Sequence, residues 1–189
     1  MTNKELLFWQ PKKDYFKHFC QFPIGRFILV ATNYIIWIFL FYISYLLIRK
    51  DINIFCQLFF ATLTGEIIEK YLKTKKIWHR PVHKNKNTIP SGLIKHWYTN
   101  GSFPSGHTIK AVFFFLFILQ YQVFNPILYW LIVLPLLSFR VFVGLHYPID
   151  VIGGAVIGMV LYLFSLPIHL PLVINNLIEK IFNFIFYVR

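Results

Sequence analysis

The residues best suited to chemistry lie in a turn at 101–108, Gly-Ser-Phe-Pro-Ser-Gly-His-Thr, directly before an apolar run that begins near Ile109. A glycine-bearing turn that leads into a helix leaves several backbone N–H groups unpaired, and the helix dipole adds to their preference for negative charge. His107 could donate a proton to a group held there. The Ser-Gly-His tripeptide is equally typical of an ordinary turn in a membrane loop, so an anion site needs support from elsewhere.

Two further polar clusters fall at the ends of apolar runs. The members of all three clusters are Lys73, Arg80 and Pro81, then Pro104, Ser105, Gly106 and His107, and finally Arg140, His146 and Asp150. The loop that holds the first cluster leads directly into the second, and two apolar runs separate the second from the third. Because two crossings return a chain to the side from which it started, we expect the clusters to converge at one face.

Three cations, two histidines, one carboxylate and a helix N-terminus together suit phosphoryl transfer, which depends mainly on positioning and charge stabilisation. An arginine fork can bind two phosphate oxygens, and a lysine supplies a point charge. A histidine beside a carboxylate has its tautomer and orientation fixed, which makes it a suitable nucleophile. The second histidine can protonate the leaving oxygen.

The acidic residues argue against a metal cofactor. The chain has only 7 Asp and Glu residues, too few to suggest a magnesium site built from several carboxylates. Two histidines and one aspartate could instead bind zinc or iron, but the surrounding cations would repel a metal ion. Cys20 and Cys56 lack metal-ligand spacing and are expected to be buried thiols. We therefore expect no metal and no other cofactor.

The order and spacing of the three clusters resemble the signature of the type 2 phosphatidic acid phosphatase superfamily. Across 73–150 the sequence has Lys, six residues and Arg-Pro, then Pro-Ser-Gly-His, then Arg, five residues, His, three residues and Asp. The resemblance implies an all-α fold with an acid phosphatase/vanadium haloperoxidase-like core. It also implies a metal-independent phosphatase whose substrate is a membrane lipid phosphate.

The resemblance assigns roles by motif position. The phosphate-binding groups would be the side chains of Lys73, Arg80 and Arg140 and the backbone groups of Ser105 and Gly106. His107 would be the general acid. His146, oriented by Asp150, would attack phosphorus to form a phosphohistidine that water then hydrolyses.

The sequence departs from the family pattern at one place. The family usually has serine immediately before the third-motif arginine, whereas Phe139 stands there and Ser138 lies one position earlier. Because one helical position turns a side chain by about 100°, Ser138 is not expected to make the same contact. Every charged and imidazole residue of the signature is present, so we expect the activity to be modified rather than lost.

The elements that must position these residues are apolar runs. Of the 189 residues, 57% are hydrophobic and 14% are charged, whereas a soluble domain carries roughly a quarter charged residues. Apolar runs of about 20 residues are long enough to cross a bilayer as helices. We predict one domain over 1–189, a polytopic membrane helix bundle with five to six transmembrane helices, at 27–48, 52–71, 109–124, 127–143, 151–166 and optionally within 171–189.

Three segments outside the first five runs have their own signals. Residues 1–25 mix basic and aromatic side chains and are expected to lie on the membrane as an interfacial amino-terminal segment. Residues 72–106 form the long polar segment and are expected to be the active-site loop. The tail, 171–189, is apolar but interrupted by polar residues, which favours an interfacial helix over a sixth span.

Gly154 and Gly158 give the run at 151–166 a small face for close helix packing.

Several other polar and aromatic residues have more ordinary interpretations. Glu66 and Glu69 either contact the basic loop or face solvent. His79, His83 and His96 are interpreted as loop or interfacial histidines, Trp78 and Trp97 as headgroup anchors, and Lys75, Lys76, Lys84 and Lys86 as membrane-facing charges. The formal net charge of +12 is concentrated beside the apolar runs, where lipid headgroups explain it, so nucleic acid is not an expected partner.

The membrane face decides which lipids are candidate substrates. The amino-terminal segment and the polar loop carry most of the Lys and Arg residues, which favours a cytoplasmic site, whereas bacterial members of the family often face outward. We expect an integral protein of the bacterial plasma (inner) membrane. A cytoplasmic site suits phosphatidylglycerophosphate or phosphatidate, and an outward site suits undecaprenyl pyrophosphate or lipid A. The signature reads the phosphate, which all four lipids share, so all four stay candidates, as do the monomer and any oligomer.

Two alternatives to a lipid phosphatase use the same residues or the same fold. One is a lipid-to-lipid phosphotransferase that forms the same phosphohistidine. The other is a non-catalytic membrane scaffold or transporter, against which the intact motif positions argue.

Overall fold

The computed structural model describes residues 3–11, 15–84 and 101–186, and the regular structure within these ranges is helical throughout. In chain order the elements are α1 (Asn3–Leu7), α2 (Tyr15–Gln21), α3 (Pro23–Lys50), α4 (Ile54–Thr74), the 3₁₀ helix η1 (Pro81–Lys84), α6 (Gly106–Tyr121), α7 (Pro126–Phe142), α8 (Pro148–Ser165) and α9 (Leu172–Phe186). The predicted all-α fold is confirmed. The five predicted apolar runs correspond to α3, α4, α6, α7 and α8, with ends close to those expected.

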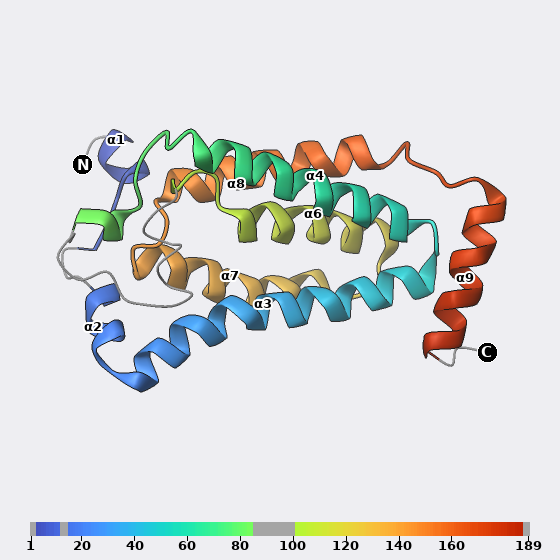
Figure 1. Cartoon of the computed structure of the whole chain (residues 1–189), viewed down its shortest axis with the longest axis horizontal. Coiled ribbons are helices and arrows are strands. Elements are labelled where there is room, and N and C mark those ends of the chain that lie inside the picture. The colour runs from blue at the N-terminus through green and yellow to red at the C-terminus, as the bar shows by residue number, and fades with distance from the viewer. Residues whose placement is uncertain (1–2, 12–14, 85–100, 187–189) are drawn as a thin grey trace.

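Helix α6 forms the centre of a bundle with α3, α4, α7 and α8 packed around it (Figure 1). The side chains of Ile109, Phe113 and Phe117 on α6 are fully buried. Helix α8 approaches most closely, because a Cβ atom at Gly154 would lie 2.7 Å from the carbonyl oxygen of Ser105. At Gly158 it would lie 2.5 Å from the carbonyl oxygen of Ile109. The predicted small-residue packing face is therefore confirmed.

Local sequence explains where three of these helices begin. Pro23, Pro126 and Pro148 stand in the first turns of α3, α7 and α8, where the missing N–H group costs no hydrogen bond. The side-chain oxygen of Asn125 caps α7 by accepting from the backbone N–H groups of Ile127 (2.9 Å) and Leu128 (3.0 Å). These residues therefore define where α3, α7 and α8 begin.

Two helices in the described ranges, α3 and α8, are long and apolar enough to cross a membrane. Helices α6 and α7 are apolar but have only 16 and 17 residues, and α4 carries charged residues in its last turns. The predicted number of five to six transmembrane helices is therefore not confirmed by length and composition, and it remains a prediction.

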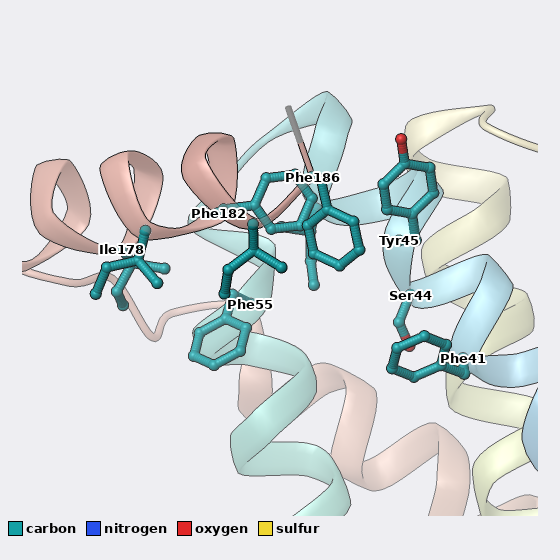
Figure 2. A pocket seen from close by; sticks show the side chains of 10 residues that line it. Phe41, Ser44, Tyr45, Phe55, Ile178, Phe182 and Phe186 are labelled. Atoms are coloured by element: carbon teal, nitrogen blue, oxygen red, sulfur yellow. The ribbon is translucent and has the colours of Figure 1, made fainter. Parts of the chain in front are cut away.

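The two ends of the bundle differ. Helices α1 and α2 and the 3₁₀ helix lie at one end, and α9 lies across the other (Figure 1). A cavity of about 400 Å³ separates α9 from α3 and α4, and Figure 2 shows its apolar lining, which includes Phe41, Tyr45 and Phe182. This cavity is at the opposite end from the three polar clusters, so it is not a candidate active site.

Candidate active site

The three polar clusters meet at the end of the bundle that carries the amino-terminal helices. The C-terminal end of α4, the first turn of α6, the last turn of α7 and the start of α8 all lie there (Figure 1). Backbone hydrogen bonds join the segments, since Ser105 N donates to the carbonyl oxygen of Asp150 (3.0 Å) and Val82 N to that of Gly144 (3.1 Å). Gly144 has a φ of 88°, a conformation that favours glycine. The sharp turn there directs the chain from α7 back to His146.

Asp150 lies fully buried behind His146 and is held from three directions. The indole N–H of Trp78 donates to Oδ1 (2.8 Å), and the backbone N–H of Tyr147 donates to Oδ2 (2.7 Å). The hydroxyl of Ser102 also donates to Oδ2. Three donors compensate the carboxylate for the loss of water, so its orientation is fixed.

His146 presents one ring nitrogen to this carboxylate and the other to an arginine. Its Nδ1 lies 3.4 Å from Asp150 Oδ2, within ion-pair distance but without hydrogen-bond geometry. Its Nε2 lies 3.4 Å from Nη1 of Arg80. Burial lowers the pKa of His146 well below its usual range, and the charges of Arg80, Arg140 and Lys73 lower it further. The imidazole is therefore neutral at pH 7, with a lone pair available for attack.

Arg80 is buried beside His146 and remains a cation. Its Nη1 donates to the carbonyl oxygen of Leu145 (2.9 Å). Burial lowers the pKa of Arg80 to about 10, while the negative charges of Asp150 and Glu69 act in the opposite direction. Its Nε is buried, and within the described part of the chain it has no hydrogen-bond partner.

Arg140 and His107 share a neighbour on α3. The Nη1 of Arg140 donates to the side-chain oxygen of Asn33 (3.1 Å), and Nε2 of His107 lies 3.5 Å from the carbonyl oxygen of Asn33. The Nε of Arg140 is also buried and has no partner among the described residues. Two guanidinium groups thus each keep one buried donor unpaired, which is the arrangement expected where an anion binds.

Lys73 and the turn before α6 are arranged around another carboxylate, that of Glu69. Lys73 pairs with Glu69 one turn away on α4. A Cβ atom at Gly106 would overlap the Glu69 carboxylate, so this carboxylate lies against the first turn of α6. Ser105 occupies the N-cap position without a side-chain cap, and its hydroxyl accepts from Thr108 (2.9 Å). The Glu69 carboxylate therefore lies at the turn where the sequence predicts an anion site, and phosphate binding there remains a prediction.

The structure also tests the more ordinary interpretations. Trp78 is half-buried and donates its indole N–H to Asp150, a contact that its interpretation as a headgroup anchor did not include. Ser138 is on the exposed side of α7, whereas Arg140 is buried, which confirms that Ser138 cannot replace the usual family serine. His79 is exposed, as expected for a loop histidine. Trp97, His96, Lys86 and the side chains of His83 and Lys84 lie outside the described residues.

Five residues near the candidate site were missed by the sequence interpretation or left open. They are Asn33, Glu69, Trp78, Ser102 and Lys110. Two carried a usable signal: Asn33 and Lys110 are polar residues inside apolar runs, and such residues usually face a cavity or a partner. Trp78 and Ser102 carried none, because their contacts with Asp150 span 72 and 48 positions in the sequence.

Residues 54–173, more than half of the chain, match the profile of the PAP2 superfamily. The chain belongs to the PAP2 superfamily. This match covers α4 to α8 and therefore every site residue predicted from the sequence, whereas Asn33 on α3 lies outside it. PAP2 membership indicates phosphatase-type hydrolysis. A search of curated proteins found no match, and neither did a search of solved structures. Within the described ranges no three His, Cys, Asp or Glu side chains gather as a metal-binding group would.

Proposed function

We propose that this PAP2 protein is an integral membrane lipid phosphatase that uses a phosphohistidine intermediate. The observation that carries the proposal is the position of His146. Its ring lies between a buried carboxylate held by three donors and the guanidinium of Arg80. Lys73, Arg140 and the Ser105-Gly106 turn reach the same end of the bundle, so a phosphate beside His146 would meet cations and backbone donors.

In the first step, Nε2 of His146 attacks phosphorus and forms a P–N bond as the P–O bond to the lipid breaks. Burial and the charges of Arg140 and Lys110 lower the pKa of His107 well below its usual range, so His107 holds its proton only while a negatively charged phosphate is bound beside it. The leaving oxygen takes this proton, and the lipid departs as an alcohol, or as a monophosphate if the substrate is a diphosphate. Attack places positive charge on the imidazole of His146, which Asp150 stabilises across 3.4 Å. The cations Lys73, Arg80 and Arg140 stabilise the negative charge on the phosphoryl oxygens.

In the second step, water attacks the phosphohistidine on the same face from which the lipid left. His107, now neutral, accepts a proton from the water, and the P–N bond breaks to release inorganic phosphate and neutral His146. This return of both imidazoles to their initial protonation states completes the cycle. No metal ion is needed at either step, because protein cations carry the charge stabilisation.

The outer surface of the bundle supports a membrane location. Large apolar side chains on α3, α7 and α8 face outward, and they include Phe27, Ile38, Phe41, Ile127, Leu131, Leu134, Leu163 and Phe164. Exposed apolar area on this scale is unfavourable in water and is expected against lipid. We therefore propose that the bundle spans the bacterial inner membrane, with α9 lying at one surface as an interfacial helix.

A groove beside the site supports a lipid substrate. It has a volume of about 440 Å³, lies between α3, α4 and α6, and is lined mainly by apolar side chains together with Lys110. Its wall residue Trp37 lies against His107, with ring centroids 6.3 Å apart. A hydrocarbon chain in this groove would place its phosphate next to His107. Phosphatidylglycerophosphate, phosphatidate, undecaprenyl pyrophosphate and lipid A all carry the required phosphate and chain.

Phosphate release from these four lipids by detergent-purified protein, in the presence of a chelator, tests the proposal. We expect release from at least one lipid and its loss in His146→Ala, because His146 is the imidazole that the described part of the chain places between Asp150 and Arg80. Release that continues in His146→Ala would contradict the phosphohistidine. Radiolabelled phosphate appearing on an acceptor lipid, without free phosphate, would instead indicate a phosphotransferase, and a folded protein inert in both assays would indicate a scaffold.

A further inference from the structure

The Glu69 carboxylate occupies a position built to hold an anion. It lies against Gly106 at the start of α6, where helix N–H groups and the helix dipole favour negative charge. It forms an ion pair with Lys73 on its own helix, and Nζ of Lys110 on α6 lies 3.4 Å from its other oxygen. Its side chain is only 15% exposed.

Lys73 and the Gly106 turn are also the groups proposed to bind the substrate phosphate. The negative charge of Glu69 further acts on both Arg80 and His146, so the carboxylate is within electrostatic reach of the reacting centre. A carboxylate and a phosphate of like charge cannot both bind the same lysine and helix N-terminus without strong repulsion. Substrate must therefore displace Glu69 from this position. Lys110, one turn further along α6 and already 3.4 Å from the carboxylate, would remain its partner.

We propose that Glu69 is a specificity-determining residue that competes with phosphate and thereby selects lipid-linked phosphate over free phosphate. The inference rests on the proposed phosphatase function. Displacement of Glu69 costs free energy, and a lipid substrate can supply it through burial of its hydrocarbon chain. Inorganic phosphate and small soluble phosphate esters have no chain, so they bind weakly while Glu69 is in place. The same competition speeds the departure of product phosphate after each cycle.

Glu66 provides a matched control for Glu69. It also pairs with Lys110, at 2.6 Å, and it lies on the same helix one turn earlier. Its side chain is 35% exposed, and the contact with Gly106 is made by Glu69. Substituting Gln for Glu at either position removes one negative charge near Lys110. Glu69→Gln removes the carboxylate that lies against the start of α6, whereas Glu66→Gln leaves it in place.

The experiment measures inhibition of lipid hydrolysis by inorganic phosphate and by vanadate in wild type, Glu69→Gln and Glu66→Gln. The inhibition constant should fall at least about tenfold in Glu69→Gln, because a close negative charge is removed from a site of reduced dielectric. It should stay within about twofold of wild type in Glu66→Gln. The ratio of kcat/KM for para-nitrophenyl phosphate to kcat/KM for the lipid should rise in Glu69→Gln alone.

A second measurement keeps the test independent of turnover. Phosphate-dependent thermal stabilisation of the same three proteins reports binding directly, so it distinguishes failure of the inference from failure of the proposed function. If Glu69→Gln folds poorly, Glu69→Asp keeps the charge and withdraws it by one methylene, and it should still bind phosphate more tightly than wild type. Unchanged or weaker phosphate binding in these variants, with wild type binding phosphate, would overturn the inference and leave Glu69 as a structural partner of the two lysines.

Discussion

At the scale of single residues, the orientation of His146 depends on side chains that never touch the substrate. Asp150 stands behind the imidazole, and its own position depends on donors from Trp78, Ser102 and the backbone of Tyr147. Each of these donors belongs to a different segment of the chain. Their role is to fix one carboxylate, and removing one of them tests how strongly that carboxylate governs the reaction.

Trp78→Phe should lower kcat roughly 10- to 100-fold, because a buried carboxylate loses a hydrogen bond whose charge-assisted strength corresponds to that factor. KM should change little, since Trp78 contacts Asp150 and not the phosphate-binding cations. Trp130→Phe is the matched control, because Trp130 on α7 is also partly buried and packs against the hydrophobic core. Steady-state kinetics on the preferred lipid give both parameters. An unchanged kcat, or a change confined to KM, would contradict the role given to Trp78.

At the scale of elements, the close contact between α6 and α8 keeps the anion-binding turn next to Asp150. Gly154 permits this contact, and the backbone hydrogen bond from Ser105 to Asp150 lies in the same region. Gly154→Ala should cost about 1–3 kcal/mol of stability through overpacking, and it should reduce activity because the Ser105 turn is pushed outward.

Thermal unfolding in detergent and activity on the preferred lipid measure the two effects of Gly154→Ala. Val156→Ile is the control, because it also adds one carbon but on a side chain that is 50% exposed. Equal stability of the two variants would show that α8 can withdraw from α6 without cost.

The elements were largely predictable from the sequence, whereas the support of the site was not. The apolar runs alone located α3, α4, α6, α7 and α8 to within about four residues of each end. The prolines at 23, 126 and 148 explain starts that the runs placed later in the sequence. The signature residues were found because their spacing is characteristic. The contacts of Trp78 with Asp150 and of Glu69 with Gly106 depend on how distant helices approach one another, and no local pattern records that approach.

At the scale of the whole molecule, the candidate active site and α9 lie at opposite ends of the bundle (Figure 1). If the bundle spans the membrane as proposed, these ends face opposite compartments. Lys75 follows α4 at the active-site end, and Asn176 belongs to α9 at the other end. Both side chains are exposed. Lys75→Cys and Asn176→Cys, each in a background with Cys20 and Cys56 replaced by serine, therefore report one end each.

A membrane-impermeant maleimide should label the two variants from opposite sides of sealed vesicles. Right-side-out and inverted vesicles supply the two orientations, and labelling after detergent lysis controls for reactivity. The variant at position 75 then assigns the face of the active site, which in turn narrows the candidate lipids. Labelling of both positions from one side would contradict the spanning arrangement.

The pairing of Glu69 with Lys73 has a consequence for how the chain is made. The two residues are one turn apart on α4, so their ion pair can form as soon as that helix exists, before α6 has been synthesised. A helix that enters lipid with its opposite charges paired costs less to insert than one with an isolated lysine. Glu69 would thus lower the cost of inserting Lys73, a proposed phosphate-binding cation, during biosynthesis, before any phosphate is present to replace it.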